Sequence, residues 1–444
     1  MLKNIISTFF THSLSLLLGI INSVLLARFL GVEGKGALAI LLAFIALFTV
    51  FLNIGLPSAV TYFISNKKFQ INKIFYTGII LVVLLSILFV MILLFNNNII
   101  KSFLIPSHFQ VLKFEIILGL LFFFKFFNSF IRAIFLGIQI IIKLNKIDIV
   151  FQILSTAVYV VLFYALIVEN NTSVFERLFF LLLIQLIILI LNSITNLLIL
   201  IREDKMRFEL EILNKSEIKF FLSWGGIAYF ANFFQFLCYR LDFWFVEFYS
   251  GLEALGIYSL SVNLIQIFWL LPNSISVVLF PYLSEKNKTK LKEEKTQILG
   301  RIIFTMLAFI GTLALITSSL LITFFYGKDF ASSSSVFNIL LISSVPYGLI
   351  TVYASFLAAN GMQIKNMRAS FLGLISTIIL DVLMIPKYGI IGAAFASSIS
   401  YFLTSIYVIF TMKNHLRVKV LDLFLLKKND LLVIKKIIYA TKQN

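Results

Sequence analysis

Four polar side chains recur at helical spacing within an otherwise apolar segment, residues 114–137. Lys125 is followed by Asn128 and Ser129 one turn later and by Arg132 two turns later. Residues that are three, four and seven apart lie on one face of an α-helix, so these side chains form a stripe. Arginine binds phosphate through two parallel hydrogen bonds, and lysine supplies a point charge. The stripe therefore predicts a site for an anionic, phosphate-bearing ligand at Lys125, Asn128 and Arg132.

The elements that must position this stripe are membrane-spanning helices. The 444-residue chain is 60% hydrophobic and 13% charged, which is too apolar for a fold surrounded by water. Spanning a bilayer core of ~30 Å takes about 20 apolar residues per helix, and a helix satisfies its own backbone hydrogen bonds. The net charge of +17 resides mainly in loops and a tail beside apolar runs. That pattern indicates topology and lipid headgroups and argues against a nucleic-acid-binding patch.

The stripe has a second interpretation that needs no ligand. A cation inside an apolar span costs a few kcal/mol unless it faces protein or water. Arg132 avoids this cost if its side chain extends to the headgroups, and Lys125 avoids it if it pairs with a neighbouring helix. The nearby carboxylates are few. Glu115 lies at the far end of the same segment, and Asp148 lies at the start of the next one. An anionic ligand is therefore the natural counterion for Lys125.

Twelve hydrophobic segments follow one another along the chain. They lie at about 5–26, 37–57, 74–95, 114–137, 148–168, 177–201, 219–240, 256–281, 298–325, 336–358, 369–385 and 391–412. Most of the 37 Lys and Arg residues lie in the C-terminal tail and in the loops that share the N-terminus's side of the membrane. The positive-inside rule therefore predicts a multi-pass protein of the bacterial cytoplasmic membrane with both termini in the cytoplasm.

A short motif occurs once in each half of the chain. GVEGKGAL begins at Gly31 and lies 220 positions before GLEALGIY, which begins at Gly251, so that Gly36 aligns with Gly256. Leu-Pro and Phe-Leu pairs recur later at similar offsets and in the same order. Internal repeats of this kind are common in membrane transporters. We therefore predict an all-α integral membrane protein of about twelve transmembrane helices, in two pseudo-symmetric six-helix bundles around a central cavity.

The repeat also predicts the division of the chain. The two bundles are expected at 1–205 and 206–412, followed by a basic cytoplasmic tail at 413–444. The tail alternates short apolar runs with lysine pairs. Two interpretations of it are open: an amphipathic helix lying on anionic lipid, and a frayed extension whose charge only satisfies topology.

Further charged residues in or beside apolar segments are candidates for function. Arg28 ends the first segment and either anchors in the interface or lines the cavity. Arg240 and Asp242 are two residues apart and so point in different directions; Arg240 either contacts substrate or pairs within the protein. Asp242 and Asp381 lie near the outer ends of segments and are candidates for proton or sodium coupling, because a partly desolvated carboxylate takes up a proton more readily. A structural role is the alternative for both carboxylates.

Several motifs, taken together in their order and spacing, resemble the polysaccharide-unit flippases. This family exports lipid-linked oligosaccharides and is related to the multidrug and toxic-compound extrusion transporters. The resemblance covers nearly the whole chain. The motifs are ARFLGVEGKGALA (27–39), NIGLPSAVTYFIS (53–65), RLDFWFVEFYSGLEALGIYSLS (240–261), LPNSISVVLFPYLSE (271–285), YGKDFASSSSVFNILLISS (326–344) and IPKYGIIGAAFASSIS (385–400).

The resemblance implies a flippase that carries polyprenyl-diphosphate-linked oligosaccharide repeat units across the cytoplasmic membrane by alternating access. The products would be O-antigen, capsule or exopolysaccharide, and the implied partners are this lipid-linked substrate and membrane lipids. A polysaccharide polymerase and other assembly proteins are further candidate partners. The chain departs from the family at 223–226, where relatives often carry a proline, and at Asp381, where they more often carry asparagine. The missing proline leaves open whether the helix is kinked at 223–226, and Asp381 leaves open whether transport is coupled to an ion.

Two other classes of protein are alternatives to the flippase. A membrane glycosyltransferase, polymerase or ligase needs a sizeable outer loop with catalytic groups, whereas the longest outer loop, about 96–113, has no carboxylate. A drug/cation antiporter of the sister family would favour acidic groups for its substrate, whereas the stripe is cationic. The three histidines and one cysteine are too scattered for a metal site. We therefore predict a transporter that is not an enzyme and has no metal site or cofactor.

Overall fold

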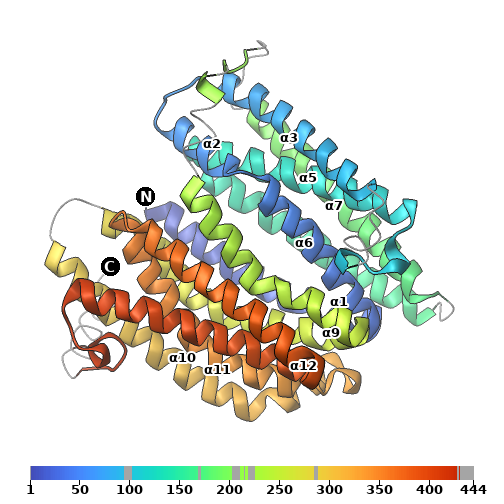
Figure 1. Cartoon of the computed structure of the whole chain (residues 1–444). Helices are drawn as coiled ribbons and strands as arrows, with labels where there is room; N and C mark the ends of the chain where they lie inside the picture. Colours follow the sequence, from blue (N-terminus) through green and yellow to red (C-terminus); the bar gives the residue numbers. More distant parts are fainter. Residues whose placement is uncertain are drawn as a thin grey trace. The chain divides into compact units, whose positions relative to one another are not determined.

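The computed structural model describes residues 2–94, 103–168, 172–202, 211–214, 216–218, 226–284, 289–427 and 430. Within these ranges the chain is helical apart from short connections and turns, and it contains no strand. The α-helices are α1 (Leu2–Leu52), α2 (Leu56–Ser65), α3 (Ile71–Leu94), α5 (Leu112–Gly137), α6 (Ile141–Val168), α7 (Val174–Arg202), α9 (Gly226–Ser284), α10 (Thr289–Tyr326), α11 (Ser333–Ala359) and α12 (Gln363–Leu416) (Figure 1). Three short 3-10 helices are η1 (Ser107–Phe109), η2 (Lys328–Phe330) and η3 (Val420–Leu423). The predicted all-α class is confirmed.

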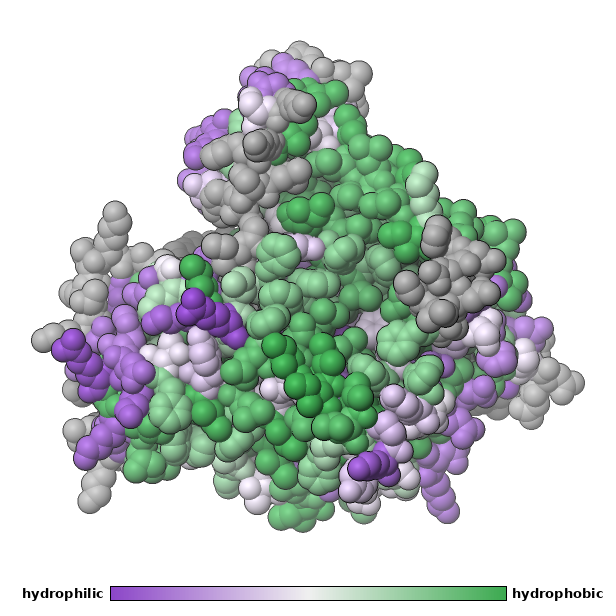
Figure 2. Space-filling view, viewed as in Figure 1, coloured by the Kyte–Doolittle hydropathy of each residue, from purple (hydrophilic) through white to green (hydrophobic). Residues whose placement is uncertain are grey.

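Nine helices among the described residues are long and apolar enough to cross a membrane. Three of them, α1, α9 and α12, are broken internally at Gly31, Gly251 and Gly389. Counting each broken helix as two spans agrees with the prediction of about twelve. The outer surface supports a bilayer setting, because α10 exposes apolar side chains at helical spacing, including Ile316 at 77% and Leu320 at 74%. On the face shown in Figure 2, hydrophobic residues cover the lengths of the helices and hydrophilic residues gather near helix ends.

The repeated motif has the same backbone conformation in both copies. Gly31 has φ 70° and ψ −173°, and Gly251 has φ 80° and ψ 178°. Side-chain-bearing residues avoid this region, so glycine is required for each sharp reversal. The agreement of two glycines 220 positions apart supports the repeat proposed from sequence.

The two copies of the motif also pack directly against each other. A Cβ atom added at Gly36 would overlap the carbonyl oxygen of Leu252, and one added at Gly256 would overlap the carbonyl oxygen of Val32. Val32 and Leu252 are themselves equivalent in the repeat, so the contact is reciprocal, as an approximate twofold relation requires. Gly36 and Gly256 are therefore needed for close backbone approach.

The described residues pack into two compact units. The first falls within Met1–Ser259 and Phe325–Phe330, and the second within Leu260–Phe324 and Ala331–Asn444. In the first unit α5 packs against α2, α3 and α7. The predicted bundles at 1–205 and 206–412 are defined by the repeat and not by packing, and they stay a prediction.

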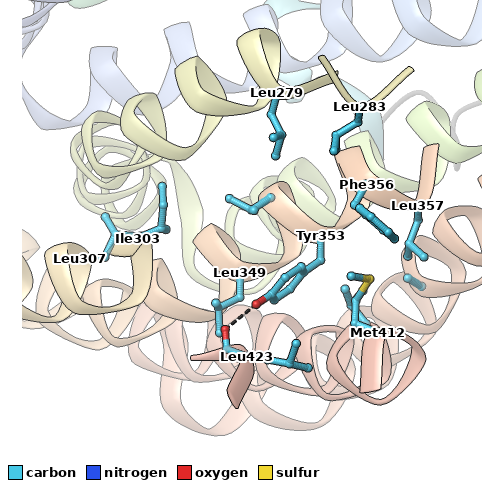
Figure 3. Packing of buried hydrophobic residues seen from close by; sticks show 13 residues of the cluster. Leu279, Leu283, Ile303, Leu307, Leu349, Tyr353, Phe356, Leu357, Met412 and Leu423 are labelled. Carbon is cyan, nitrogen blue, oxygen red and sulfur yellow. Dashed lines mark hydrogen bonds between the residues drawn. The ribbon is translucent and has the colours of Figure 1, made fainter. Parts of the chain in front are cut away.

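The second unit has an apolar core that includes part of the C-terminal tail (Figure 3). Leucines from α9 and α10 meet Tyr353, Phe356 and Leu357 of α11, and Leu423 of η3 is fully buried among them. The Tyr353 hydroxyl donates a hydrogen bond to the backbone carbonyl of Leu423. We call residues 417–427 together with Asp430 the strap, because this stretch crosses and packs on the helix ends.

A buried ion pair holds the far end of the strap. Arg301 of α10 donates from Nε and Nη2 to the two carboxylate oxygens of Asp430, both at 2.7 Å. Its Nη1 donates to the backbone carbonyl of Asp422 at 2.6 Å. The described part of the tail is thus neither a free amphipathic helix nor a frayed extension. Residues 431–444, on which the same prediction was made, lie outside the described residues.

The Arg301–Asp430 pair predicts a stability that depends on pH. Burial raises the pKa of Asp430, but the hydrogen bonds and positive charges of Arg301 and Lys427 outweigh it, so this pKa lies below the ordinary 3.8. A depressed carboxyl pKa contributes stability above its ordinary value, and this contribution is lost as pH falls through the folded pKa. We expect Asp430→Asn to speed amide hydrogen exchange in the strap at neutral pH by at least tenfold, because breaking a buried pair costs about 3–5 kcal/mol.

Asp422→Asn is the matched control for this prediction. The Asp422 carboxylate is partly exposed and pairs with Lys427 at 2.8 Å. Exposed pairs are worth only about 0–1 kcal/mol, so exchange should change little. Equal exchange rates in the two variants would show that the buried pair does not hold the strap.

Candidate functional site

A cavity of about 820 Å³ opens on α5 in the first unit. Lys125, Asn128, Ser129 and Arg132 all line it, so the predicted stripe does share one face. Its volume is in the range of small-molecule binding sites. The role of these residues as ligand contacts stays a prediction.

A second wall of the cavity is formed by α2. This short helix follows a break at Ile54 and Gly55, which both have positive φ, and Pro57 lies in its first turn. Its apolar face is buried, whereas its polar face turns to the cavity and carries Ser58, Thr61, Tyr62 and Ser65. Thr61 donates to the backbone carbonyl of Ala133 at 3.0 Å, which fixes α2 beside α5. Hydroxyl groups therefore line the same cavity as the cations, which was not predicted from the sequence.

Lys125 is half-buried in the wall of the cavity. It forms no hydrogen bond or ion pair with any residue that the structure describes. No Asp or Glu is among the described residues that line this cavity. A cation at membrane depth without a countercharge favours an anionic occupant of the space in front of it.

Arg132 lies two turns along α5 and forms an ion pair with Asp148 near the start of α6. The Arg132 side chain is 42% exposed and that of Asp148 is 22% exposed. Partly exposed pairs contribute at most about 1 kcal/mol, so this bond does not commit Arg132 to a structural role. A guanidinium carries five N–H donors, and only Nη1 is assigned to Asp148.

Asn128 belongs to a buried cluster of three amides between α5 and α7. Its Nδ2 donates to Asn192 at 2.8 Å, and Asn196 donates to Asn128 at 2.8 Å and to Asn192 at 2.7 Å. The sequence analysis did not identify Asn192 and Asn196. Their spacing of four residues within an apolar segment was the available signal. The cluster fixes α7 against the helix that carries both cations.

We expect Asn196→Leu to lower stability by about 1–3 kcal/mol, because it leaves the buried Oδ1 of Asn128 without its donor. Thermal unfolding in detergent measures this effect. Thr195→Leu is the control, since Thr195 is half-buried and its hydroxyl donates within its own helix, to the backbone carbonyl of Leu191. If both variants unfold at the same temperature, the amide cluster contributes nothing to stability.

The other two predicted substrate-binding residues are not brought together with the stripe. Arg28 donates from Nε to the backbone carbonyl of Phe325 at 2.7 Å. The guanidinium of Arg240 lies 4.8 Å from the ring centroid of Phe243, within cation–π distance. Neither residue is among those that line the α5 cavity.

The two predicted coupling carboxylates are both buried. Asp242 accepts a hydrogen bond from Tyr258, so the pair bridges the two arms of α9 across the break at Gly251. Asp381 lies in α12 one turn after Thr377 and is fully buried. Their role in ion coupling stays a prediction. Among the described residues, no group of three His, Cys, Asp or Glu side chains is placed to hold a metal ion.

Comparison with known proteins identifies relatives in one functional area. The family model described as polysaccharide biosynthesis protein matches residues 1–287. The capsular polysaccharide biosynthesis protein CapF of Staphylococcus aureus is 30% identical over 165 residues, which is 35% of this chain and 40% of that protein. The probable flippase AglR of Haloferax volcanii is 29% identical over 194 residues, 41% of this chain and 40% of that protein. The chain thus matches about two fifths of the length of these relatives.

Solved structures share the fold over almost the whole chain. The lipid II flippase MurJ in an inward closed conformation has a TM-score of 0.68 and 19% identity, covering 93% of this chain and 88% of that one. An inward-facing multidrug resistance MATE family transporter of the MOP superfamily has a TM-score of 0.69 and 11% identity, covering 91% of this chain and 96% of that one. The predicted fold is confirmed.

Proposed function

The chain belongs to the polysaccharide biosynthesis protein family, and from this premise we infer that it is a flippase for lipid-linked oligosaccharides. It would move the diphosphate and sugar headgroup of a polyprenyl-linked precursor across the membrane by alternating access. The relatives that carry the words capsular polysaccharide biosynthesis and flippase in their names support this class of substrate. Supply of O-antigen, capsule or exopolysaccharide units in a bacterial cytoplasmic membrane, with both termini inside, is the specific form of the proposal.

The observation that carries the proposal is the placement of Lys125 in the cavity. Lys125 has no countercharge among the described residues that line the cavity. Arg132 lies about 10 Å further along the helix axis, at 1.5 Å per residue. Together the two cations suit an anion with two charged groups. The hydroxyl groups of α2 that line the same cavity suit sugar and phosphate oxygens. The same electrostatics oppose the alternative of a drug/cation antiporter, whose substrate would be repelled.

Transport by the purified protein tests the proposal. Proteoliposomes would be loaded with a polyprenyl-diphosphate oligosaccharide in both leaflets, and a glycosidase that cannot cross membranes would be added outside. We expect cleavage of nearly all the lipid-linked sugar, because the inner pool is brought to the outer leaflet. Cleavage of only about half, as in protein-free vesicles, would contradict the assignment. A cationic dye in the same vesicles tests the antiporter alternative.

Ion coupling through Asp242 or Asp381 is a separate part of the proposal. Each carboxylate would take up a proton or sodium ion in one conformation of the transport cycle. Asp242→Asn and Asp381→Asn should then change the pH or sodium dependence of flipping without lowering membrane insertion. Wild-type ion dependence in both variants would assign the two carboxylates a structural role, with Tyr258 as the partner of Asp242.

A further inference from the structure

The strap has an outer face that the core of the second unit does not use. Leu423 is fully buried, whereas Leu421, Leu425 and Leu426 are 56%, 47% and 37% exposed. Exposed leucines on both sides of a buried one form an amphipathic surface on a segment that is already docked. Large exposed apolar side chains of this kind mark a contact with lipid or with another protein.

Basic side chains accompany the exposed leucines. Arg417 and Lys419 are exposed, and the carboxylate of Asp422 is shared between Lys419 and Lys427. Asp422 is paired with Lys427, and Asp430 is paired with Arg301. The outer face therefore combines apolar side chains with a net positive charge.

The position of the strap is set by the helices on which it packs. It contacts the cluster formed by Leu283 close to the end of α9, Leu357 close to the end of α11 and Met412 close to the end of α12. Helix ends in a membrane protein lie at the level of the headgroups. The leucines of the outer face are thus held where acyl chains begin, with cations at the depth of lipid phosphates.

We propose that the outer face of the strap is a binding surface for anionic phospholipid. Leu421, Leu425 and Leu426 enter the boundary between headgroups and acyl chains, while Arg417 and Lys419 bind phosphates. Charge complementarity and depth both favour lipid over a protein partner. The buried Arg301–Asp430 pair transmits this attachment to α10, so that the lipid surface anchors the ends of the helices in the second unit.

A fluorescent reporter on the outer face tests the proposal. Leu425→Cys in a Cys238→Ser background would carry an environment-sensitive dye, with the full chain in nanodiscs of phosphatidylcholine alone or with increasing phosphatidylglycerol. We expect the emission to shift to the blue as phosphatidylglycerol is added. The double variant Arg417→Gln/Lys419→Gln should bind anionic lipid roughly twenty-five-fold more weakly and so need correspondingly more of it for the same shift, since each basic residue near the surface contributes about fivefold in affinity.

The matched control removes two positive charges elsewhere in the second unit. Lys365→Gln/Arg368→Gln lowers the net charge equally but leaves the strap unchanged, so the shift should follow the wild type. An emission that is insensitive to phosphatidylglycerol would overturn the proposal. Equal responses of both double variants would also overturn it, because the effect would then be one of net charge. Loss of the wild-type shift only when a second protein is added would assign the surface to a protein partner instead.

Discussion

Lys125→Ala is expected to lower the rate of oligosaccharide-lipid flipping by at least tenfold while leaving the protein folded in the membrane. The ammonium group faces the cavity and has no countercharge among the described residues. Its removal deletes a charge-assisted interaction with the diphosphate, and such bonds are worth about 1.5–3 kcal/mol. Flipping would be measured with the glycosidase assay, and folding by thermal unfolding in detergent.

Substitutions that keep the charge separate substrate binding from packing. Lys125→Arg should retain much more activity than Lys125→Met, because the diphosphate responds to charge whereas Met preserves only volume. Arg132→Lys should lose activity if its contact with phosphate is bidentate. Lys146→Ala is the control, since Lys146 is exposed near the start of α6 and does not line the cavity. Full flipping by a Lys125→Ala/Arg132→Ala double variant would remove this cavity from the proposed function.

Gly36→Ala is expected to destabilise the protein by about 3 kcal/mol, the upper end of what overpacking typically costs, because the added methyl group meets backbone. The methyl group would overlap the carbonyl oxygen of Leu252, and a backbone carbonyl cannot rotate away as a side chain can. Gly256→Ala should cost a similar amount, since its methyl group would overlap the carbonyl oxygen of Val32. Thermal or denaturant unfolding of the purified variants would measure both.

Two comparisons make this prediction specific to the reciprocal contact. Gly19→Ala adds the same methyl group to α1 at a position with no heavy atom within 4 Å, so it should be neutral or stabilising by about 0.5–1 kcal/mol. The double variant Gly36→Ala/Gly256→Ala should cost less than the sum of the single variants, because separating the two motifs once relieves both overlaps. Additive losses would mean that the two contacts are independent.

The sequence by itself determined the environment, the helices and the stripe, because each depends on short-range periodicity. Apolar runs of membrane length predicted the spans, and the three-, four- and seven-residue spacing put Lys125 and Arg132 on one face of α5. The repeated glycines were visible as well, because the conformation of Gly31 and Gly251, with positive φ and ψ near 180°, is open to glycine and not to residues that carry a Cβ atom. None of these inferences needed to know which helix lies beside which.

Tertiary structure decided everything that depends on a partner distant in the chain. Asn128 meets an amide 64 positions later, and Arg301 meets Asp430 at a separation of 129. Helical periodicity repeats every few residues and carries no information about such pairs, so the amide cluster and the strap were missed. The same holds for Arg28, whose charge suggested the cavity but whose guanidinium is used by a carbonyl 297 positions away. A charged side chain forms its hydrogen bond with whichever polar group packing brings within about 3 Å. Only the folded chain specifies that group.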